Sequence, residues 1–249
     1  MEVARLKPPL NEKWEQKGEA VSTEKSGLFC FCPMDFLRSE RGDFLLSGRA
    51  PHAIIILRIL KGTAAMPYFA VIDTETNWVD QVMSIGTVIA DADTFRPVAA
   101  KYHILPAYCE AGGMYYDALF LEPPVKPICY TRQAAMRELL SLCAQYGVTE
   151  IFAYNARFDK THLPELGCLQ WHDIMRLAAY RQHNPKIPAT ADLCSTGRLK
   201  RGYGVEPMLR LLSGNRGYHE THNAIFDALD ELEIMRLLGH PLEHYLPLL

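Results

Sequence analysis

The order of strand and helix patterns after Met66 is the feature that most constrains how this chain can fold. Runs of β-branched and aromatic residues come first, and a later run alternates with helical patterns. The predicted strands are residues 68–73, 83–90, 98–105 and 151–154. The predicted helices are residues 131–146, 155–165, 205–212 and 223–238. Strands that come first and then alternate with helices predict an α/β fold, with a mixed central sheet flanked by helices.

Residues 1–65 show no sustained helical or alternating pattern, so we divide the chain into an unassigned segment, 1–65, and a domain, 66–249. Lys61-Gly62 lies a few codons before Met66, and AAR-GGN is the codon pair expected of a bacterial ribosome-binding site. We therefore hypothesise that translation starts at Met66 and that residues 1–65 are upstream DNA read as protein. A peptide from residues 1–60 in a mass spectrum of the native protein would exclude this hypothesis.

Composition narrows the class of protein. The 249 residues are 49% hydrophobic and 22% charged, which is typical of a soluble globular protein and excludes collagen, coiled coil and disorder. The net charge of -3 gives the protein no long-range positive field, which argues against a protein that coats duplex DNA by bulk electrostatics. Any contact with nucleic acid must therefore be local. The seven cysteines contain no C-x-x-C pair, which predicts reduced thiols and a cytoplasmic protein. No apolar stretch is long enough to span a bilayer, so no membrane partner is expected.

Two motifs place acidic residues at the ends of predicted strands. Asp73 and Glu75 end the first strand, where a period of two puts both carboxylates on one face, although D-x-E alone fits a solvated strand end better than a site. Asn155-Ala-Arg-Phe-Asp159 follows a buried strand, with Asn155 near the expected N-cap and Asp159 one turn further along the same helix face. A capped helix explains Asn155 but leaves the pairing of Phe158 with Asp159 unexplained.

A third motif, H-x-A-x-x-D, runs from His222 to Asp227 at the start of the last helix. Five residues on a helix correspond to about 140° of rotation, so the two side chains share a site only if His222 precedes the helix. Asn223 is a suitable N-cap for that arrangement. Asp230 and Glu231, one turn further on, are expected to be exposed helix charges rather than ligands.

In this order the three motifs resemble those of the DEDDh 3′→5′ exonucleases of the ribonuclease H-like superfamily. That family includes the polymerase III epsilon proofreading subunit, ribonuclease T and oligoribonuclease, and the resemblance spans about residues 67–239. It implies a ribonuclease H-like fold and an enzyme that releases nucleoside 5′-monophosphates from the 3′ end of single-stranded DNA or RNA. It also implies a general base, His222, and four catalytic metal ligands, which are Asp73, Glu75, Asp159 and Asp227.

The chemistry of these side chains agrees with that implication. Four carboxylates in one cleft raise one another's pKa unless divalent cations neutralise them. All-oxygen ligation predicts Mg²⁺ or Mn²⁺ rather than zinc, and two such ions about 4 Å apart can hold the attacking and leaving oxygens of a phosphodiester. Asp73 is the predicted bridging ligand, and His222 is predicted to take the proton from the attacking water.

Residues near the motifs are candidates for substrate binding. The predicted substrate contacts are Thr74, Thr76, Trp78, Asn155 and Phe158. The two threonines are expected to hydrogen-bond the terminal sugar, and the tryptophan is expected either to stack on a base or to pack in the core. A basic run, Arg198, Lys200 and Arg201, is either a solvated face or a phosphate track.

The same residues leave other functions and some details of the substrate open. A non-catalytic nucleic-acid-binding or regulatory module on this fold is the main alternative, although every ligand and the base are present. His240-Pro-Leu-Glu-His244 spells the metalloprotease pattern H-x-x-E-H, but Pro241 would disrupt the helix that this pattern requires. The motifs do not separate DNA from RNA or short oligonucleotides. Because no polymerase segment accompanies the domain, a proofreading role would require a polymerase supplied in trans.

Overall fold

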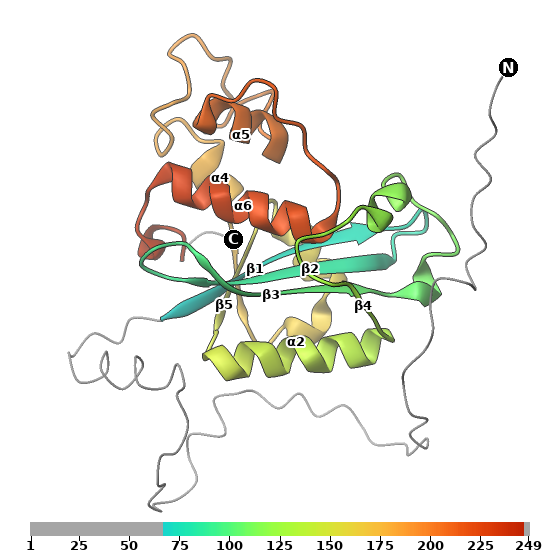
Figure 1. The fold of residues 1–249 in the computed structure, drawn as a ribbon. Helices are drawn as coiled ribbons and strands as arrows, with labels where there is room; N and C mark the ends of the chain where they lie inside the picture. Colours follow the sequence, from blue (N-terminus) through green and yellow to red (C-terminus); the bar gives the residue numbers. More distant parts are fainter. Residues whose placement is uncertain (1–66, 247–249) are drawn as a thin grey trace, which may run out of the picture. The chain divides into compact units, whose positions relative to one another are not determined.

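The computed structural model describes residues 67–246, and the predictions about residues 1–65 lie outside this range. Six strands form one sheet in the order β4-β3-β2-β1-β5-β6 (Figure 1). The strands are β1 (Tyr68–Thr76), β2 (Val82–Asp91), β3 (Pro97–Ile104), β4 (Ile128–Cys129), β5 (Glu150–Ala153) and β6 (Gln170–Asp173). The α-helices are α2 (Arg132–Tyr146), α3 (Arg157–His162), α4 (Met175–Ala178), α5 (Val205–Ser213) and α6 (Ala224–Leu238). The 3₁₀ helices are η3 (Pro106–Tyr108), η4 (Tyr116–Phe120), η5 (Pro164–Leu166) and η6 (Leu242–His244).

The sheet is mixed, and β1 joins its two halves. β1 pairs with β2, and β2 with β3, in antiparallel register, whereas β5 and β6 continue from β1 in parallel. The carboxyl ends of β1, β5 and β6 therefore lie at the same edge of the sheet. Helices lie on both faces, so the predicted α/β class with a mixed central sheet flanked by helices is confirmed.

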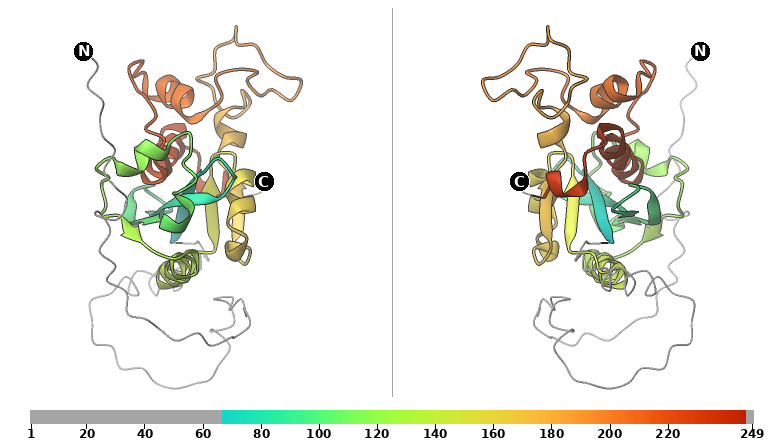
Figure 2. Two further views of the ribbon diagram at one scale, coloured as in Figure 1. Left: turned by 90° about the vertical axis from the view of Figure 1, so that its right-hand side faces the viewer. Right: turned by 90° about the vertical axis from the view of Figure 1, so that its left-hand side faces the viewer.

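The two faces of the sheet are covered by different helices. α2 lies against one face and α6 against the other (Figures 1 and 2). Alternate residues of β1, including Ala70 and Ile72, belong to the same buried cluster as Ala135 and Leu139 of α2. Because side chains alternate along a strand, Asp73 and the other odd-numbered residues of β1 point to the α6 face. The sheet thus separates a largely apolar layer from the layer that holds the acidic motif.

A glycine in β2 lets α6 approach the sheet closely. A Cβ added to Gly86 would lie 2.0 Å from the carbonyl oxygen of Ala224, the first residue of α6. Backbone atoms cannot yield as a flexible side chain can, so any larger residue at this position would push α6 away. The contact fixes the start of α6, and with it Asp227, over the strands that carry the first motif.

Helix boundaries were predicted well where they depend on local capping. Thr131 accepts a hydrogen bond from the Ala134 N–H at the start of α2, and Gly147 ends this helix in the left-handed region with φ 64°. Asn223 likewise caps α6 through the Ile225 N–H. Gly239 ends α6 with φ 67°.

The single helix predicted over 155–165 is wrong. α3 spans only Arg157–His162, and η5 follows it after a break at Leu163, which has φ -122°. The break precedes Pro164, and proline disfavours helical geometry in the residue before it. Asn155 lies near the N-cap as predicted, with φ 62°, one residue before Ala156, which is the N-cap of α3. β6 and α4 lie in a polar stretch for which no element was predicted.

No disulfide joins the five cysteines within residues 67–246, which are Cys109, Cys129, Cys143, Cys168 and Cys194. Among the same residues, no helix combines the length and the apolar character needed to cross a bilayer.

Candidate active site

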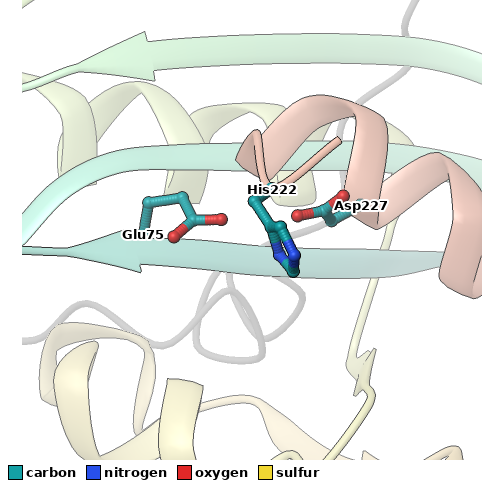
Figure 3. A group of neighbouring side chains, drawn as sticks. All are labelled: Glu75, His222 and Asp227. Atoms are coloured by element: carbon teal, nitrogen blue, oxygen red, sulfur yellow. The ribbon is translucent and has the colours of Figure 1, made fainter. Parts of the chain in front are cut away.

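The first and third motifs meet at one point between β1 and α6. One ligand atom from each of Glu75, His222 and Asp227 lies within 4.8 Å of the other two. Figure 3 shows the Glu75 carboxylate extending from its strand toward the carboxylate and imidazole that come from the start of α6. The prediction that His222 precedes the helix is confirmed, since α6 begins at Ala224.

The second motif joins this group through a hydrogen bond. The Thr74 hydroxyl donates to Oδ1 of Asp159 over 2.7 Å, which ties α3 to β1. Both residues are buried. The charge of Asp159, together with those of Asp227 and Glu75, raises the pKa of Asp73, although burial is the largest cause. Carboxylates from β1, α3 and α6 therefore lie close enough to affect one another, and we call this group, Asp73, Glu75, Asp159 and Asp227, the acidic cleft.

Crowding and burial give these carboxyl groups unusual pKa values. Burial raises the pKa of Glu75 to about 8, while its side-chain hydrogen bond with Asp227 lowers it. Burial raises the pKa of Asp227 to about 9, with further contributions from the charges of Glu220 and Glu75. Burial also raises the pKa of Asp159 to about 7, against the lowering effect of the Thr74 hydrogen bond. Each acid would regain its charged form more easily beside a cation.

The donor atoms of the cleft fit a divalent metal ion. Among the described residues, Oδ2 of Asp73 and Oδ1 of Asp227 are buried without a hydrogen-bond partner. Buried carboxylate oxygens normally find a partner, and metal ions are one such partner. Carboxylate oxygens are the preferred ligands of Mg²⁺ and Mn²⁺, while the nearby imidazole also suits transition metals.

Two contacts and a strained backbone set the position of His222. The residue has φ 55°, a conformation that residues other than glycine rarely adopt. The Tyr115 ring stacks on its imidazole with centroids 3.8 Å apart and planes at 14°. On another side, Nδ1 of His222 lies 4.0 Å from Oε1 of Glu220. Neither Tyr115 nor Glu220 was predicted, because no local pattern links either residue to the motif.

The expectation that Glu231 is an exposed helix charge is wrong. The residue is 1% exposed, and its Oε2 atom has no hydrogen-bond partner among the described residues. Burial raises its pKa well above the usual range, and the charges of Asp159 and Asp227 add to this effect. Its spacing of one turn after Asp227 is the signal that could have placed it on the same helix face. Asp230, by contrast, is half-buried and accepts a hydrogen bond from the Tyr218 hydroxyl.

The predicted substrate contacts lie around this cleft in different environments. The hydroxyl of Thr74 is already used by Asp159, so its first role is to position that carboxylate. Thr76 is half-buried, and Asn155 is exposed. Trp78 is 65% exposed, so the alternative that it packs in the core is wrong. Phe158 is 40% exposed, and its ring lies 4.3 Å from that of His162.

Comparison with known proteins finds similar structures but no matching family model or curated sequence. Several solved structures are similar to this chain, and 3′-exonucleases are among them. One is described as recognising the 3′ end of a histone mRNA stem-loop, with a TM-score of 0.49, 10% identity, and coverage of 76% of this chain and 72% of that one.

Two further solved structures complete the comparison. The nuclease domain of 3′hExo bound to rAMP has a TM-score of 0.48 and 11% identity, and covers 72% of this chain and 95% of that one. Its description names the DEDDh family, the family that the three motifs resemble. Zinc-bound exonuclease I from E. coli in complex with single-stranded DNA has a TM-score of 0.45 and 14% identity over 70% of this chain. The matched region spans only 41% of the length of exonuclease I.

Proposed function

We propose that this protein is a divalent-metal-dependent 3′→5′ exonuclease. It hydrolyses the last phosphodiester bond of single-stranded DNA or RNA and releases a nucleoside 5′-monophosphate. The observation that carries the proposal is the meeting of Glu75, Asp227 and His222 within 4.8 Å, near the buried Asp159 and the half-buried Asp73. Acidic metal ligands next to an imidazole are the parts that hydrolysis of a phosphodiester requires.

The metal ligands in this proposal are Asp73, Glu75, Asp159 and Asp227. The unpartnered oxygens of Asp73 and Asp227 support it, because they are buried donor atoms without another use among the described residues. Mg²⁺ or Mn²⁺ at these oxygens would neutralise the negative charge that develops on the phosphate. We propose two ions, with Asp73 as the ligand common to both.

The protein's own residues supply the proton transfer. His222 accepts a proton from the water whose oxygen attacks the terminal phosphorus, and imidazole is the usual base for this task near neutral pH. The bond between phosphorus and the 3′-oxygen of the preceding nucleotide then breaks, and that oxygen takes up a proton. Tyr115 holds the imidazole plane by stacking, so that the base keeps one orientation throughout.

A nuclease assay of the purified full-length chain tests the proposal. Single-stranded DNA and RNA oligomers of matched sequence, labelled at the 3′ end, are incubated with Mg²⁺, Mn²⁺ or EDTA. We expect metal-dependent release of labelled mononucleotides. Asp73→Asn should lose several kcal/mol of transition-state stabilisation, which is roughly a 10³-fold loss of rate. Asp93→Asn, an exposed position between β2 and β3, is the matched control.

The same assay separates the remaining alternatives. Binding of the labelled oligomers without release of mononucleotides would replace the proposal with a non-catalytic binding module. The ratio of DNA to RNA hydrolysis identifies the natural polymer, and faster removal of a mismatched 3′ end from a primed template would support proofreading with a polymerase in trans. The described cysteines, which form no disulfide with one another, support a reducing compartment such as the cytoplasm.

A further inference from the structure

A second polar pocket lies on the side of α3 away from the acidic cleft. It has a volume of about 610 Å³, and four of its nine lining residues are cations from three segments of the chain. Arg157 and Lys160 come from α3, Arg176 comes from α4, and Arg198 comes from the connection between α4 and α5. We call this feature the basic pocket. Figure 2 shows the connection that carries Arg198 extending away from the sheet.

The basic pocket carries a net positive charge that its own residues do not neutralise. Its one acidic residue, Asp173, accepts hydrogen bonds from the N–H groups of Asn155 and Met175, and its Oδ2 lies 3.9 Å from Nε of Arg176, so it offsets one of the four cations. Within residues 67–246, the side chains of Arg157 and Lys160 have no hydrogen-bond or ion-pair partner. Four cations that converge on one hollow with a single carboxylate favour an anionic ligand, and arginine in particular matches the geometry of phosphate.

The other two cations are held by aromatic residues and remain available to a ligand. An Arg176 Nη1 atom donates to the Tyr180 hydroxyl over 3.2 Å, and the Arg198 guanidinium lies 4.6 Å from the centre of the Tyr203 ring. Neither contact neutralises the positive charge. Tyr180 also lines the pocket, so an aromatic ring lies beside the cations, as in sites that bind single-stranded nucleic acid.

The pocket and the acidic cleft share one helix and one edge of the sheet. Asn155 follows β5 and Asp173 ends β6, at the same edge where β1 carries Asp73. On α3, Asp159 is buried toward the cleft, whereas Arg157 and Lys160 are exposed. A helix with its side chains is about 10 Å wide, so a ligand that reaches both places must be longer than one nucleotide.

We propose that the basic pocket binds the phosphodiester backbone of a single-stranded nucleic acid whose 3′ end lies in the acidic cleft. This inference rests on the proposed exonuclease function and specifies its substrate as a strand long enough to cross α3. It also narrows the prediction that Arg198, Lys200 and Arg201 form either a solvated face or a phosphate track. Only Arg198 of that run lines the pocket, and Lys200 instead pairs with Asp192 at 2.9 Å.

The test compares long and short substrates in the full-length chain. The variant is Arg176→Gln/Arg198→Gln, and the matched control is Arg96→Gln/Arg137→Gln, which removes the same charge at exposed positions outside the pocket. The substrates are a single-stranded oligomer of about 12 nucleotides, within the usual size of such sites, and a dinucleotide. Melting temperatures equal to that of the wild type establish that all variants fold.

We expect KM for the oligomer to rise roughly tenfold in the pocket variant, with kcat unchanged. The slope of log Kd against log salt, measured by fluorescence anisotropy in metal-free buffer, should fall by about 0.7 for each phosphate contact that is lost. Hydrolysis of the dinucleotide should stay as in the wild type. Arg176→Lys/Arg198→Lys should recover part of the affinity, because it keeps the charge but loses the arginine geometry.

Several results would overturn the inference. An unchanged KM for the oligomer, or an equal rise in the control variant, would show that the pocket does not bind the strand. A mononucleotide that inhibits the wild type but not the pocket variant, with the oligomer KM unchanged, would make the pocket a site for a free nucleotide. If the wild type hydrolyses neither substrate, the proposed function fails. Anisotropy then still shows whether the pocket binds a strand.

Discussion

The Thr74 hydroxyl donates a hydrogen bond to Oδ1 of Asp159 over 2.7 Å, so β1 directly positions a carboxylate of α3. The two residues belong to different motifs, and the bond between them is buried. The bond also lowers the pKa of Asp159, against the effect of burial. Thr74 thus keeps this acid closer to the charged form that a metal ion binds.

Thr74→Val should weaken metal binding. The valine removes the hydroxyl that donates to Oδ1 of Asp159, so the pKa of the acid should rise and its affinity for Mg²⁺ should fall. Losing such a supporting contact typically costs a factor of about 10 to 100 in metal affinity. Exonuclease rate as a function of Mg²⁺ concentration measures the change. Thr94→Val, in the turn between β2 and β3, is the control, and overlapping Mg²⁺ curves would contradict the role assigned to Thr74.

His222→Asn should reduce the rate and leave substrate binding intact. Asparagine tolerates the left-handed backbone at this position, so the change removes the base without added strain. Loss of a general base typically costs a factor of about 10² to 10⁴ in rate. Single-turnover kinetics give the rate, and anisotropy gives the affinity for the oligomer. The control is His219→Asn in the same loop, and an equal loss in both variants would indicate a structural effect.

Without divalent ions, the protein should become less stable as pH rises. The pKa values of Glu75, Asp227 and Asp159 are about 8, 9 and 7 in the folded state, above those of unfolded acids. The folded state therefore binds more protons than the unfolded state between about pH 4 and pH 9, and stability falls across this window. In EDTA, the melting temperature should be lower at pH 8 than at pH 6. Mg²⁺ should raise it more at pH 8, and an equal rise at both pH values would argue against an acidic metal site.

Glu231→Gln should remove part of this pH dependence. Glu231 is buried beside the cleft, and its pKa is raised by burial and by the charges of Asp159 and Asp227. A neutral glutamine keeps the size and loses the titration, so the metal-free protein should gain stability at pH 8 and the difference between pH 6 and pH 8 should shrink. The control is Glu233→Gln, a position on the same helix that pairs with Arg236. An unchanged difference in melting temperature would mean that Glu231 does not titrate with the cleft.

Gly86→Ala should destabilise the fold. The added Cβ would lie 2.0 Å from the carbonyl oxygen of Ala224, and only a shift of α6 can relieve that contact. Forcing atoms into a packed interior typically costs about 1 to 3 kcal/mol, and the cost here should reach the upper end of that range. Urea unfolding measures it. Gly204→Ala is the control, because its Cβ would meet no atom closer than 4.0 Å, and equal stability of the two variants would contradict the packing argument.

Features that depend on neighbouring residues could be predicted from the sequence. The ends of α2 follow from the Thr131 side chain and the left-handed Gly147, both local effects. The common face of Asp73 and Glu75 follows from strand alternation, and the position of His222 before α6 follows from the Asn223 cap. These inferences are local, and the expectation that Glu75, His222 and Asp227 meet comes from the resemblance of the three motifs, taken together, to a known family.

Features that depend on tertiary packing could not be predicted. Glu231 is buried because α6 lies on the sheet, and its spacing of one turn after Asp227 indicates a shared helix face but not burial. The stacking of Tyr115 on His222 joins residues far apart in the sequence, from a connection without a regular pattern. β6 has only four residues, Gln-Trp-His-Asp, and it forms because β5 offers it a parallel edge. The pocket behind α3 likewise arises from three separate segments.

The central position of β1, which pairs with β2 in antiparallel and with β5 in parallel register, links the proposed catalytic site to completion of the fold. Because β2 holds it on one side and β5 on the other, Asp73 meets Asp159 and Asp227 only after both neighbours have paired. No fragment that ends before α6 contains the whole acid set. Recovery of nuclease activity during refolding should therefore follow the last step of assembly, and turnover itself can serve as a probe of the native state.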